Sequence, residues 1–400
     1  MAEDYVTRVV ATPAEVDACA WDSLLHTQGD ASPFMHHAYL SALHTSASAG
    51  PGNGWTPHFI LLYAGAELAG ACLVYEKTHS YGEYVFDWAW ANAYAEHGLP
   101  YYPKALVAVP FTPVPGVRLL ARTPAARRAC LRALLLWCQQ RGVSSLHLLF
   151  LAQEDAAACA AAGLMLRHNV QFHWTNRQPG YPDFDAFLAC LTQDKRKKIR
   201  QERRKVHDAG VRFRWAQGGD ITPHDWDFFY ECYARTYLEH GNPPYLKRGF
   251  FARIAHSMPQ HWLMFTAERD GRPMASSLIA LSGPSSAAAL AGADGTRVAY
   301  GRYWGALERI DCLHFETCYY QPLQWCIEHN YQRFEGGAQG EHKMARALLP
   351  VKTTSAHWLA HPAFADAVAR HLQREGQGID DYLNDLAQRN PLRRSSTPEP

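Results

Sequence analysis

The sequence lacks several features that would assign a protein to a broad class directly. Its 400 residues carry a formal net charge of only +1, so no overall electrostatic field favours a nucleic acid or a membrane as partner. No apolar run is long enough to span a bilayer, and the first residues, MAEDYVTRVV, contain no signal-peptide hydrophobic region. We therefore expect a cytoplasmic protein without a transmembrane segment.

The sequence also lacks the short motifs that reveal common chemistries. Its ten cysteines form no C-x-x-C pair, and no group of Cys, His, Asp or Glu has a persuasive metal-ligand spacing. The G-x-S-x-G elbow, the Walker A loop, the H-E-x-x-H motif and the EF-hand loop are absent as well. We expect reduced thiols and no metal cofactor, and the function must be inferred from less specific patterns.

The composition supports large buried cores, because 48% of the residues are hydrophobic and 12% are aromatic. At roughly 100–200 residues per domain, the length predicts two domains. The polar, turn-rich segment Arg177–Pro182 indicates a boundary between them. We predict a first domain over residues 1–176, a second over residues 177–390, and a disordered tail over residues 391–400 that is rich in Arg, Ser and Pro.

The two halves share an order of predicted elements. Each contains a β-hairpin closed by a glycine turn, Trp55–Lys77 in the first half and Trp262–Leu281 in the second. Helices precede each hairpin, and further strands and a helix follow it. In the second half we predict a strand over Ala287–Ala293 and a turn at Gly301. The repeated order suggests duplicated α/β domains.

A basic helix is predicted over Lys195–Val206, ending before Gly210. Basic residues occupy every side of this helix, and Glu202 is its only acid. Like charges at helical spacing repel one another, and a polyanion such as tRNA, a lipid diphosphate, coenzyme A or an anionic membrane would relieve the repulsion. The alternative is an ordinary solvated face. The residues proposed to bind an anion are Lys195, Lys198 and Arg203.

The segment Gly301–Pro350 contains the densest potential chemistry in the chain. A helix is predicted from Pro322 to about Asn330, followed by a strand over Tyr331–Glu335. Gly336, Gly337 and Gly340 then interrupt the backbone and set acidic, imidazole and amine groups close together. Helix, strand, glycine-rich turn and clustered acid and base groups are typical of the wall of a functional site.

Mixed polar and aromatic side chains identify possible substrate-binding positions. The loop from His79 to Trp90 has the composition of a small-molecule pocket, or alternatively of a strand end with core aromatics. Three residues just after Gly301 could stack on or grip a substrate, or alternatively pack at a helix entry. The full set of substrate-binding candidates is His79, Tyr81, Glu83, Asp87, Trp88, Lys104, Tyr245, Arg302, Tyr303, Trp304 and Lys343.

Several segments resemble one known family. The run KTHSYGEYVFDWAWANAYAEHGLPYYPKALVAVPFTPVPGVRLL looks like the FemAB-like predicted N-acyltransferases of the peptidoglycan biosynthesis or recognition group. The segments DKRKKIRQERRKV, RTYLEHGNPPYL, YGRYWGA and FEGGAQGEHK look like that family in the same order, so the resemblance covers about Asp30–Leu359. It implies an α/β fold of two tandem domains of the GCN5-related N-acetyltransferase (GNAT) type. Each domain would have a mixed, mostly antiparallel sheet flanked by helices.

The resemblance also implies acyl or aminoacyl transfer to an amine, with no direct indication of the donor. Fem transferases use aminoacyl-tRNA, whereas ordinary acetyltransferases of this fold use acetyl-coenzyme A. The latter hold the coenzyme pyrophosphate with an R/Q-x-x-G-x-G/A turn at a helix N-terminus. No such turn follows the predicted strand Ala287–Ala293, although Gly292, Gly295 and Gly301 are present at other spacings.

Acyl transfer needs a group that takes the amine proton and a group that helps the leaving group depart. Glu316 and Glu335 are the carboxylate candidates for the base, and His342 and His314 are the imidazole candidates. Tyr319 could protonate the leaving group. Alternatively, Glu316 only caps a helix or pairs with Arg309 or Arg302, and His342 is an ordinary surface residue.

Two classes of function remain open from the sequence. The first is an N-acyltransferase that moves an acyl or aminoacyl group from acyl-coenzyme A, aminoacyl-tRNA or another activated donor to an amine. The acceptor amine would belong to a small molecule, a peptide or a cell-envelope precursor. The second is a non-catalytic protein on the same scaffold that binds a glycan, a lipid or a nucleic acid. The Glu, His and Tyr cluster favours the first, and the missing pyrophosphate turn favours the second. The sequence does not indicate an oligomeric state.

Overall fold

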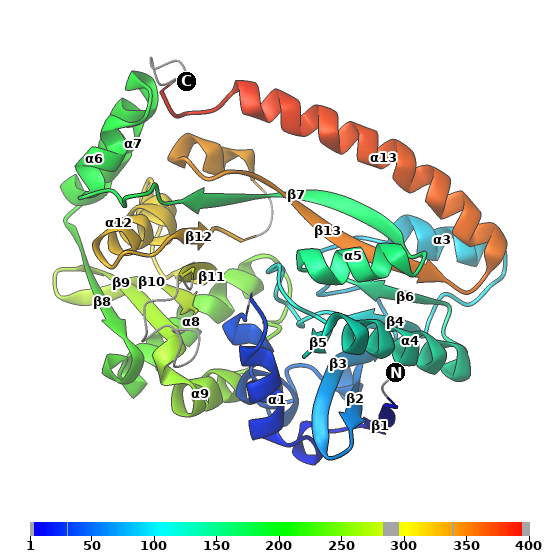
Figure 1. Cartoon of the computed structure of the whole chain (residues 1–400). Helices are drawn as coiled ribbons and strands as arrows, with labels where there is room; N and C mark the ends of the chain where they lie inside the picture. Colours follow the sequence, from blue (N-terminus) through cyan, green and yellow to red (C-terminus); the bar gives the residue numbers. More distant parts are fainter. Residues whose placement is uncertain (1–3, 30, 283–295, 338–339, 394–400) are drawn as a thin grey trace. The chain divides into compact units, whose positions relative to one another are not determined.

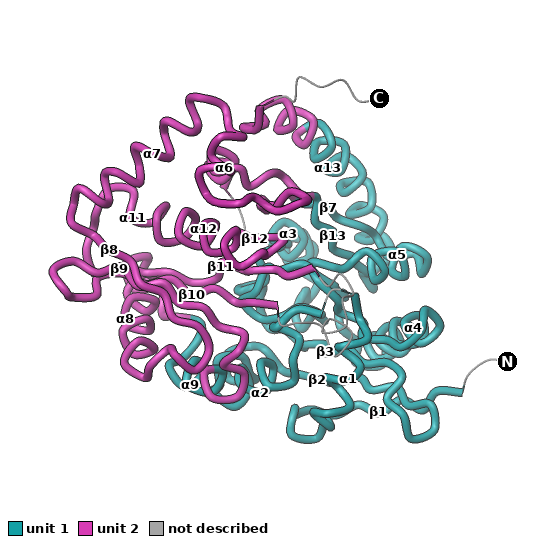
Figure 2. The backbone as a smooth tube through the Cα atoms, turned by 60° about the vertical axis from the view of Figure 1, so that its left-hand side comes forward, with its two compact units in different colours: residues 1–169, 245–254, 352–381 teal, residues 170–244, 255–351, 382–400 magenta. Residues whose placement is uncertain are grey.

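The computed structural model describes residues 4–29, 31–282, 296–337 and 340–393 of the chain (Figure 1). These residues fall into two units, coloured separately in Figure 2. Unit 1 comprises residues 1–169, 245–254 and 352–381, and unit 2 comprises residues 170–244, 255–351 and 382–400. The units are therefore not contiguous in sequence, whereas the sequence analysis predicts one boundary near residue 176.

Unit 1 contains an antiparallel sheet with one parallel pair. Its strand order is β1-β2-β3-β4-β6-β13, and only β4 and β6 run parallel. The strands are β1 (Val6–Val10), β2 (Trp55–Ala64), β3 (Glu67–Lys77), β4 (Lys104–Val107), β6 (Ser145–Leu148) and β13 (Leu349–Leu359), with the short β5 (Leu120–Ala121) beside β3. The helices are α1 (Ala18–His26), α2 (His37–Thr45), α3 (Trp88–Glu96), α4 (Pro124–Arg141) and α5 (Gln153–Ala161).

Local signals in the sequence define the best-formed elements of unit 1. The predicted hairpin Trp55–Lys77 is confirmed as β2 and β3. Helix α4 begins after Thr123, whose side chain accepts a hydrogen bond from the backbone of Ala126, and ends at Gly142 in the left-handed conformation (φ 64°). Buried α4 residues such as Leu134 pack against the strands in one core.

Unit 2 repeats this design. Its strand order is β7-β12-β11-β10-β9-β8, and only β11 and β12 run parallel. The strands are β7 (Met165–Thr175), β8 (Val211–Gln217), β9 (Trp262–Arg269), β10 (Arg272–Leu281), β11 (Val298–Ala306) and β12 (Arg333–Glu335). The helices are α6 (Phe184–Ala189), α7 (Gln193–Asp208), α8 (Pro223–Glu239), α11 (Leu313–Phe315) and α12 (Gln321–Glu328). Two further helices, α9 (Arg248–Ser257) and α13 (Pro362–Gln388), begin in unit 1 and end in unit 2.

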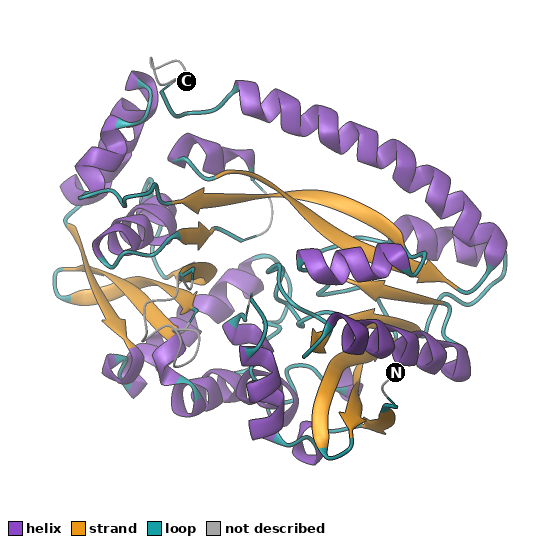
Figure 3. Cartoon of the chain, viewed as in Figure 1, coloured by secondary structure: helices purple, strands orange, loops and turns teal. Residues whose placement is uncertain are grey.

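Figure 3 colours the helices and strands of the chain. One order of elements occurs twice along the sequence: two helices precede a hairpin, a third strand follows, and a helical connection leads to a strand parallel to the third. This connection contains α4 between β4 and β6, and α11 with α12 between β11 and β12. Parallel neighbours need such a crossover, so the repeat explains the single parallel pair in each sheet. The duplicated α/β organisation is confirmed.

Two local expectations are corrected. Gly301 does not form a turn but lies inside β11. The predicted strand Ala287–Ala293 lies within 283–295, outside the described residues, and stays a prediction. The basic helix, observed as α7, has a buried face made by Ile199, Glu202 and Val206, so its charges do not surround it completely. Of the predicted tail over residues 391–400, the structure describes residues up to 393, and Leu392 forms an antiparallel β-bridge with Leu191.

Among the helices in the described ranges, none combines the length and apolar character that crossing a bilayer requires.

Candidate functional site

A small cavity opens in unit 2 where β11 and β12 part. The parallel pairing joins Val298–Tyr300 to Arg333–Glu335, and β12 then ends while β11 continues to Ala306. The space beside the second half of β11 holds a cavity of about 120 Å³. Its lining residues come from β10, β11, the following helix and the backbone after β12: Ser277, Ile279, Gly301, Arg302, Tyr303, Trp304, His314, Cys318, Tyr319 and Gly336. We call it the transfer cavity.

A β-bulge shapes one wall of the transfer cavity. Leu278 of β10 faces Tyr303, but the next residue, Ile279, faces Gly301. Arg302 is therefore an extra residue in β11, and such bulges locally bend a strand and change the direction of its side chains. As a result, Arg302, Tyr303 and Trp304 all line the cavity, as the sequence analysis proposed for a substrate contact.

A widened helical turn shapes the opposite wall. Residues Glu316–Tyr320 form a π-helical turn in which the backbone N–H of Gln321 donates to the carbonyl of Glu316, five residues earlier. Pro322 follows, and because proline has no N–H it cannot bond the carbonyl four residues before it. Single π-turns inside helices occur frequently at functional sites. Here the turn brings Cys318 and Tyr319 to the cavity together with His314.

Acid and base groups converge at this wall. The Tyr319 hydroxyl lies 3.5 Å from Nε2 of His342, and the rings of Tyr319 and His314 meet edge to face at 5.6 Å. Lys343 donates a 2.9 Å hydrogen bond from Nζ to the carbonyl of Gly337. His342 and Lys343 lie on a short 3₁₀ segment, Glu341–Arg346, directly after the glycine-rich stretch. Three of the candidate site residues, Tyr319, His342 and Lys343, therefore lie near one another.

Burial sets the protonation of these groups. Burial, with smaller effects of His342, Arg346 and Lys343, lowers the pKa of His314 to about 4. Burial also lowers the pKa of His342, lowers that of Lys343 to about 8, and raises that of Tyr319 well above its usual value. Near neutral pH the imidazoles are thus uncharged and can accept a proton, whereas Tyr319 keeps its proton and can donate it.

Gly336 allows this close packing. A Cβ atom at this position would lie 2.6 Å from Cδ2 of Leu348, 3.4 Å from Cε1 of Tyr319 and 3.5 Å from Cδ of Lys343. The first distance is too short for a normal contact. Any side chain here would push into the wall of the transfer cavity, so glycine has a clear steric role at this position.

The structure places the two carboxylate candidates away from the transfer cavity. Glu316 points toward α7, where its Oε1 accepts hydrogen bonds from Nε of Arg203 at 3.1 Å and from Nε2 of Gln321 at 2.7 Å. Glu335 lies 3.0 Å from Nε of Arg333 and 3.9 Å from Nδ1 of His173. Neighbouring Phe334 packs in the core, so strand alternation directs Glu335 to the other face of the sheet. The two glutamates are close in sequence to Tyr319 and His342 but do not line the cavity.

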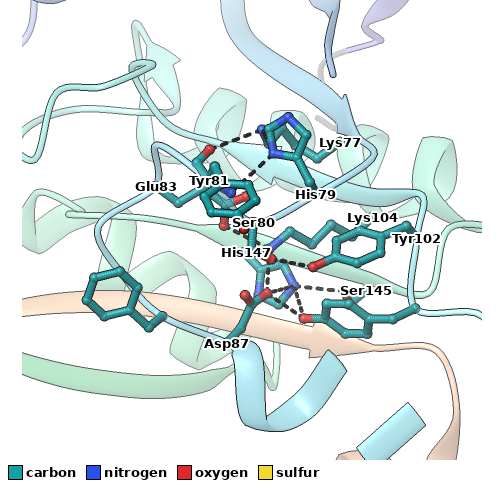
Figure 4. Close-up of polar contacts among 12 residues, drawn as sticks. Lys77, His79, Ser80, Tyr81, Glu83, Asp87, Tyr102, Lys104, Ser145 and His147 are labelled. Atoms are coloured by element: carbon teal, nitrogen blue, oxygen red, sulfur yellow. Dashed lines mark hydrogen bonds and ion pairs between the residues drawn. The ribbon is translucent and has the colours of Figure 1, made fainter. Parts of the chain in front are cut away.

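Binding candidates in unit 1 form a buried network, drawn in Figure 4. Lys104 donates 2.8 Å hydrogen bonds to Ser80 and Glu83, and it also bonds Asp87. Lys104, Glu83 and Asp87 are 0%, 4% and 3% exposed. Burial raises the pKa of Glu83 to about 7; burial also acts to raise that of Asp87, but Lys104 outweighs it and holds that pKa below its usual value. The network is closed to solvent and stabilises the region around β4.

Three members of this network were not identified from the sequence. The Tyr101 hydroxyl donates a 2.6 Å hydrogen bond to Asp87 and lies 3.2 Å from Nε2 of His147. Nδ1 of His147 in turn lies 2.7 Å from Nδ1 of His357. The two histidines face each other across the antiparallel pair of β6 and β13. Only the register between these distant strands reveals the contact, so the sequence offers no local signal for it.

The other candidates in unit 1 lie nearer the surface. Tyr81 is 60% exposed and Trp88 is 37% exposed, and their rings meet edge to face at 5.1 Å. Nδ1 of His79 accepts a hydrogen bond from the backbone N–H of Tyr81. Tyr245 stacks on Phe111 with the ring centroids 4.7 Å apart. These aromatic side chains form exposed or half-buried contacts rather than one enclosed pocket.

The basic helix contributes partly paired cations in unit 2. Arg203 is occupied by Glu316 and also donates a 3.0 Å hydrogen bond to Gln324. Lys198 is 58% exposed at its side chain and lies 4.0 Å from Glu202. Lys195 is half-buried. Of the three anion-binding candidates, Arg203 therefore has a defined structural contact, and the two lysines have looser surroundings.

The connection after β11 differs from a phosphate-binding turn. Residues 307–312, between β11 and α11, contain no glycine, and they include Glu308 and Asp311. A pyrophosphate would meet acidic side chains here, whereas phosphate-binding turns offer glycine-rich backbone N–H groups. The sequence analysis finds no pyrophosphate-binding turn after the predicted strand Ala287–Ala293. The structure places β11 before α11, and the connection between these two elements does not have such a turn either.

Comparisons with known proteins give one family and several similar folds. Residues 12–394 match the model of the FemAB-like family, which is described as a family of peptidoglycan biosynthesis/recognition. The chain is similar to the C-terminal domain of a putative lysylphosphatidylglycerol synthetase from Agrobacterium fabrum, with 10% identity, a TM-score of 0.51, and coverage of 89% of this chain and 96% of that one. It is also similar to FemX, with 9% identity, a TM-score of 0.51, and coverage of 90% and 100%. No curated protein sequence matches.

The structural similarities establish the fold, because identities of 9% and 10% are too low to carry more. They extend over most of both chains, so the folds of both units are shared. The predicted α/β fold, with a mixed, mostly antiparallel sheet in each of two tandem units, is confirmed. Together with the family match, the fold supports an acyl- or aminoacyl-transferase.

Proposed function

Because the chain belongs to the FemAB-like family, we propose that it transfers an acyl or aminoacyl group from an activated donor to an amine at the transfer cavity of unit 2. The family resemblance predicted from the sequence is confirmed over nearly the whole chain. The observation that carries the site assignment is the convergence of Tyr319, His342, His314 and Lys343 where β11 and β12 part. A reacting carbonyl placed there would meet His314 and Tyr319, which line the cavity, whereas His342 and Lys343 are not lining residues and lie beside Tyr319 and Gly336.

The proposed chemistry follows from the protonation of these groups. An uncharged amine attacks the carbonyl carbon of the donor, and an oxyanion forms while the amine nitrogen becomes positively charged. A neutral imidazole of His314 or His342 takes the amine proton, and the hydroxyl of Tyr319 gives a proton to the leaving group as the intermediate collapses. Since Tyr319 lies 3.5 Å from His342, the proton can return to the phenol and restore the starting state. The ammonium form of Lys343 would stabilise the oxyanion.

The donor is the finer part of the proposal. The acidic, glycine-free connection after β11 argues against an ordinary coenzyme A pyrophosphate site. The name of one structural neighbour, a putative lysylphosphatidylglycerol synthetase, supports an aminoacyl group. The basic α7, with Lys195 and Lys198, supports an anionic carrier such as tRNA. We therefore favour aminoacyl-tRNA as the donor, with acyl-coenzyme A as the second candidate.

We propose an amine as the acceptor and the cytoplasm as the cellular location. An amine of a cell-envelope precursor fits the family description, and a peptide or small-molecule amine is the alternative. The ten cysteines are all free thiols, which fits the reducing cytoplasm. Both statements are open to direct measurement.

The donor can be tested by ligand-dependent thermal stability of the whole protein. A ligand that binds the folded state raises the melting temperature, because it stabilises that state by RT ln(1 + L/Kd), where L is the concentration of free ligand. Charged tRNA, uncharged tRNA, acetyl-coenzyme A and longer acyl-coenzymes A should be compared at several salt concentrations. We expect charged tRNA to stabilise the protein, with an effect that falls as salt rises. Stabilisation by acyl-coenzyme A alone would overturn the favoured donor, and stabilisation by none of them would contradict the assignment of a donor site.

A further inference from the structure

A second cavity of unit 2 lies on the α7 side of the helix that contains Glu316. It has a volume of about 560 Å³ and shares no lining residue with the transfer cavity. Its polar lining residues are Arg203, Arg204, His207, Arg212, Glu316 and Gln321. We call it the arginine cavity. It contains three guanidinium groups and a single carboxylate.

The local fold concentrates the positive charge. Helix α7 ends at Asp208, and Gly210 adopts a left-handed conformation (φ 78°) that turns the chain directly into β8. This tight reversal sets the last turns of α7 beside the first residues of β8, so Arg204 and Arg212 line the same cavity. Neither arginine has an ion-pair partner among the described residues. Both arginines are exposed, so water screens the repulsion between them, and both are free to contact an anion bound in the cavity.

One lining residue of the arginine cavity, Glu316, has a carboxylate oxygen without a hydrogen-bond partner among the described residues. Glu316 is only 3% exposed, and its Oε1 accepts from both Arg203 and Gln321. Its Oε2 is also buried and has no hydrogen-bond partner in the described part of the chain. Leaving a buried carboxylate oxygen without a partner is costly, and such atoms usually face a water or a ligand. A donor group of a bound molecule would complete the set.

These two features together select the chemistry of a ligand. A simple anion would satisfy the arginines but would offer nothing to Glu316, and a simple amine would be repelled by the guanidinium groups. We propose that the arginine cavity binds a small zwitterion, whose anionic group contacts Arg204 and Arg212 and whose ammonium group donates a hydrogen bond to Oε2 of Glu316. Amino acids and phosphorylated amines share this chemistry. The inference does not rest on the transferase proposal, because the two cavities have no residue in common.

Calorimetric titration of the whole protein tests the proposal without any need for transfer activity. The probes are O-phosphoethanolamine and L-serine, which are zwitterions with a phosphate and a carboxylate, and inorganic phosphate and ethanolamine, which each carry charge of one sign only. We expect at least one zwitterion to bind about tenfold or more tightly than either single-charge probe, since a hydrogen bond to a charged group contributes at this level. The tighter zwitterion identifies the anionic group.

Two substitutions separate the two contacts. Arg212→Gln should abolish measurable binding of the zwitterion, while Arg132→Gln, the same change on the exposed face of α4, should leave it unchanged. Glu316→Gln should reduce the preference for the zwitterion over phosphate to less than about threefold. Melting temperatures of the variants show whether each remains folded. Equal affinity for phosphate and the zwitterion in the wild type, no binding of either zwitterion, or an Arg212→Gln variant with unchanged affinity would each overturn the proposal.

Discussion

Two neighbouring tyrosines give the sharpest test of the transfer cavity. Tyr319 and Tyr320 follow each other in the π-turn, but their hydroxyl groups have different surroundings. The Tyr319 hydroxyl contacts His342 at 3.5 Å, at the limit of hydrogen-bond geometry. The Tyr320 hydroxyl donates to the buried carboxylate of Glu202, which also accepts a 2.9 Å hydrogen bond from Arg346. Removing the Tyr319 hydroxyl therefore removes the proposed proton donor, whereas removing the Tyr320 hydroxyl removes a stabilising hydrogen bond to a buried charge.

The expected magnitudes follow from these contacts. Tyr319→Phe loses only a long hydrogen bond, so the free energy of unfolding should fall by at most about 0.5 kcal/mol. Losing a general acid should slow transfer by about 10²- to 10⁴-fold. Tyr320→Phe loses a hydrogen bond to a buried charge, at about 1.5–3 kcal/mol. For a unit of this size that lowers the melting temperature by about 3–12 °C. Its transfer rate should stay within about threefold of wild type.

The assay compares transfer rate and thermal stability for the wild type and both variants. Rates are measured with the donor that stabilises the protein, at saturating donor and at a temperature well below every transition. The account requires that activity and stability separate between the two positions. A Tyr319→Phe variant that transfers at the wild-type rate would remove Tyr319 from the chemistry. Equal loss of rate in both variants would mean that the π-turn has only a structural role.

Three further predictions concern packing and charge. Gly336→Ala should reduce transfer at least tenfold by intruding on the transfer cavity, whereas Gly219→Ala, where an added Cβ meets nothing within 4 Å, should leave transfer unchanged in the same assay. Burial lowers the pKa of Lys77 from 10.5 to about 7, so the unfolded chain binds the proton more tightly and stability should rise with pH from 7 to 10. A Lys77→Met variant should show a smaller rise in melting temperature over this range, and identical pH profiles would contradict that sign. Lys104→Met should cost about 3–5 kcal/mol in urea unfolding because it leaves buried carboxylates without their cation, and adding Glu83→Gln should recover part of the loss; unaltered stability of the single variant would refute the reasoning.

The sequence predicts the elements that depend on local chemistry. Both hairpins and α4 are found because glycine turns, proline at the first helical position and apolar periodicity act over a few residues. The positions of Tyr319, His342 and Lys343 near one another also follow from local order, since a glycine-rich stretch joins the helix and strand to the segment that contains the last two.

Side-chain direction is less accessible from the sequence. Glu316 was expected beside Tyr319, but the π-turn directs Glu316 to α7 and Tyr319 to the transfer cavity. The turn depends on Pro322, which has no N–H to donate to the carbonyl four residues before it. This effect matters only if the helix already extends back to Leu313, and the sequence analysis starts the helix at Pro322. Glu335 was misplaced for a simpler reason, because its strand alternates and Phe334 occupies the core face.

Contacts between distant segments could not be predicted at all. His147 and His357 are 210 residues apart and meet because β6 and β13 pair in one particular register. Register is set by the packing of the whole sheet, and a shift of either strand by one residue would send its histidine to the opposite face. The unpartnered oxygen of Glu316 likewise becomes visible only from coordinates.

The central claim is that the donor occupies the cavity beside the second half of β11. Hydrogen–deuterium exchange, measured by mass spectrometry with and without the stabilising donor, tests it most directly. The account predicts slower exchange with donor in peptides covering residues 301–306 and 314–319, and little change in peptides of β2 and β3. Protection that appears elsewhere, with unchanged exchange in 301–306 and 314–319, would contradict the assignment of the transfer cavity.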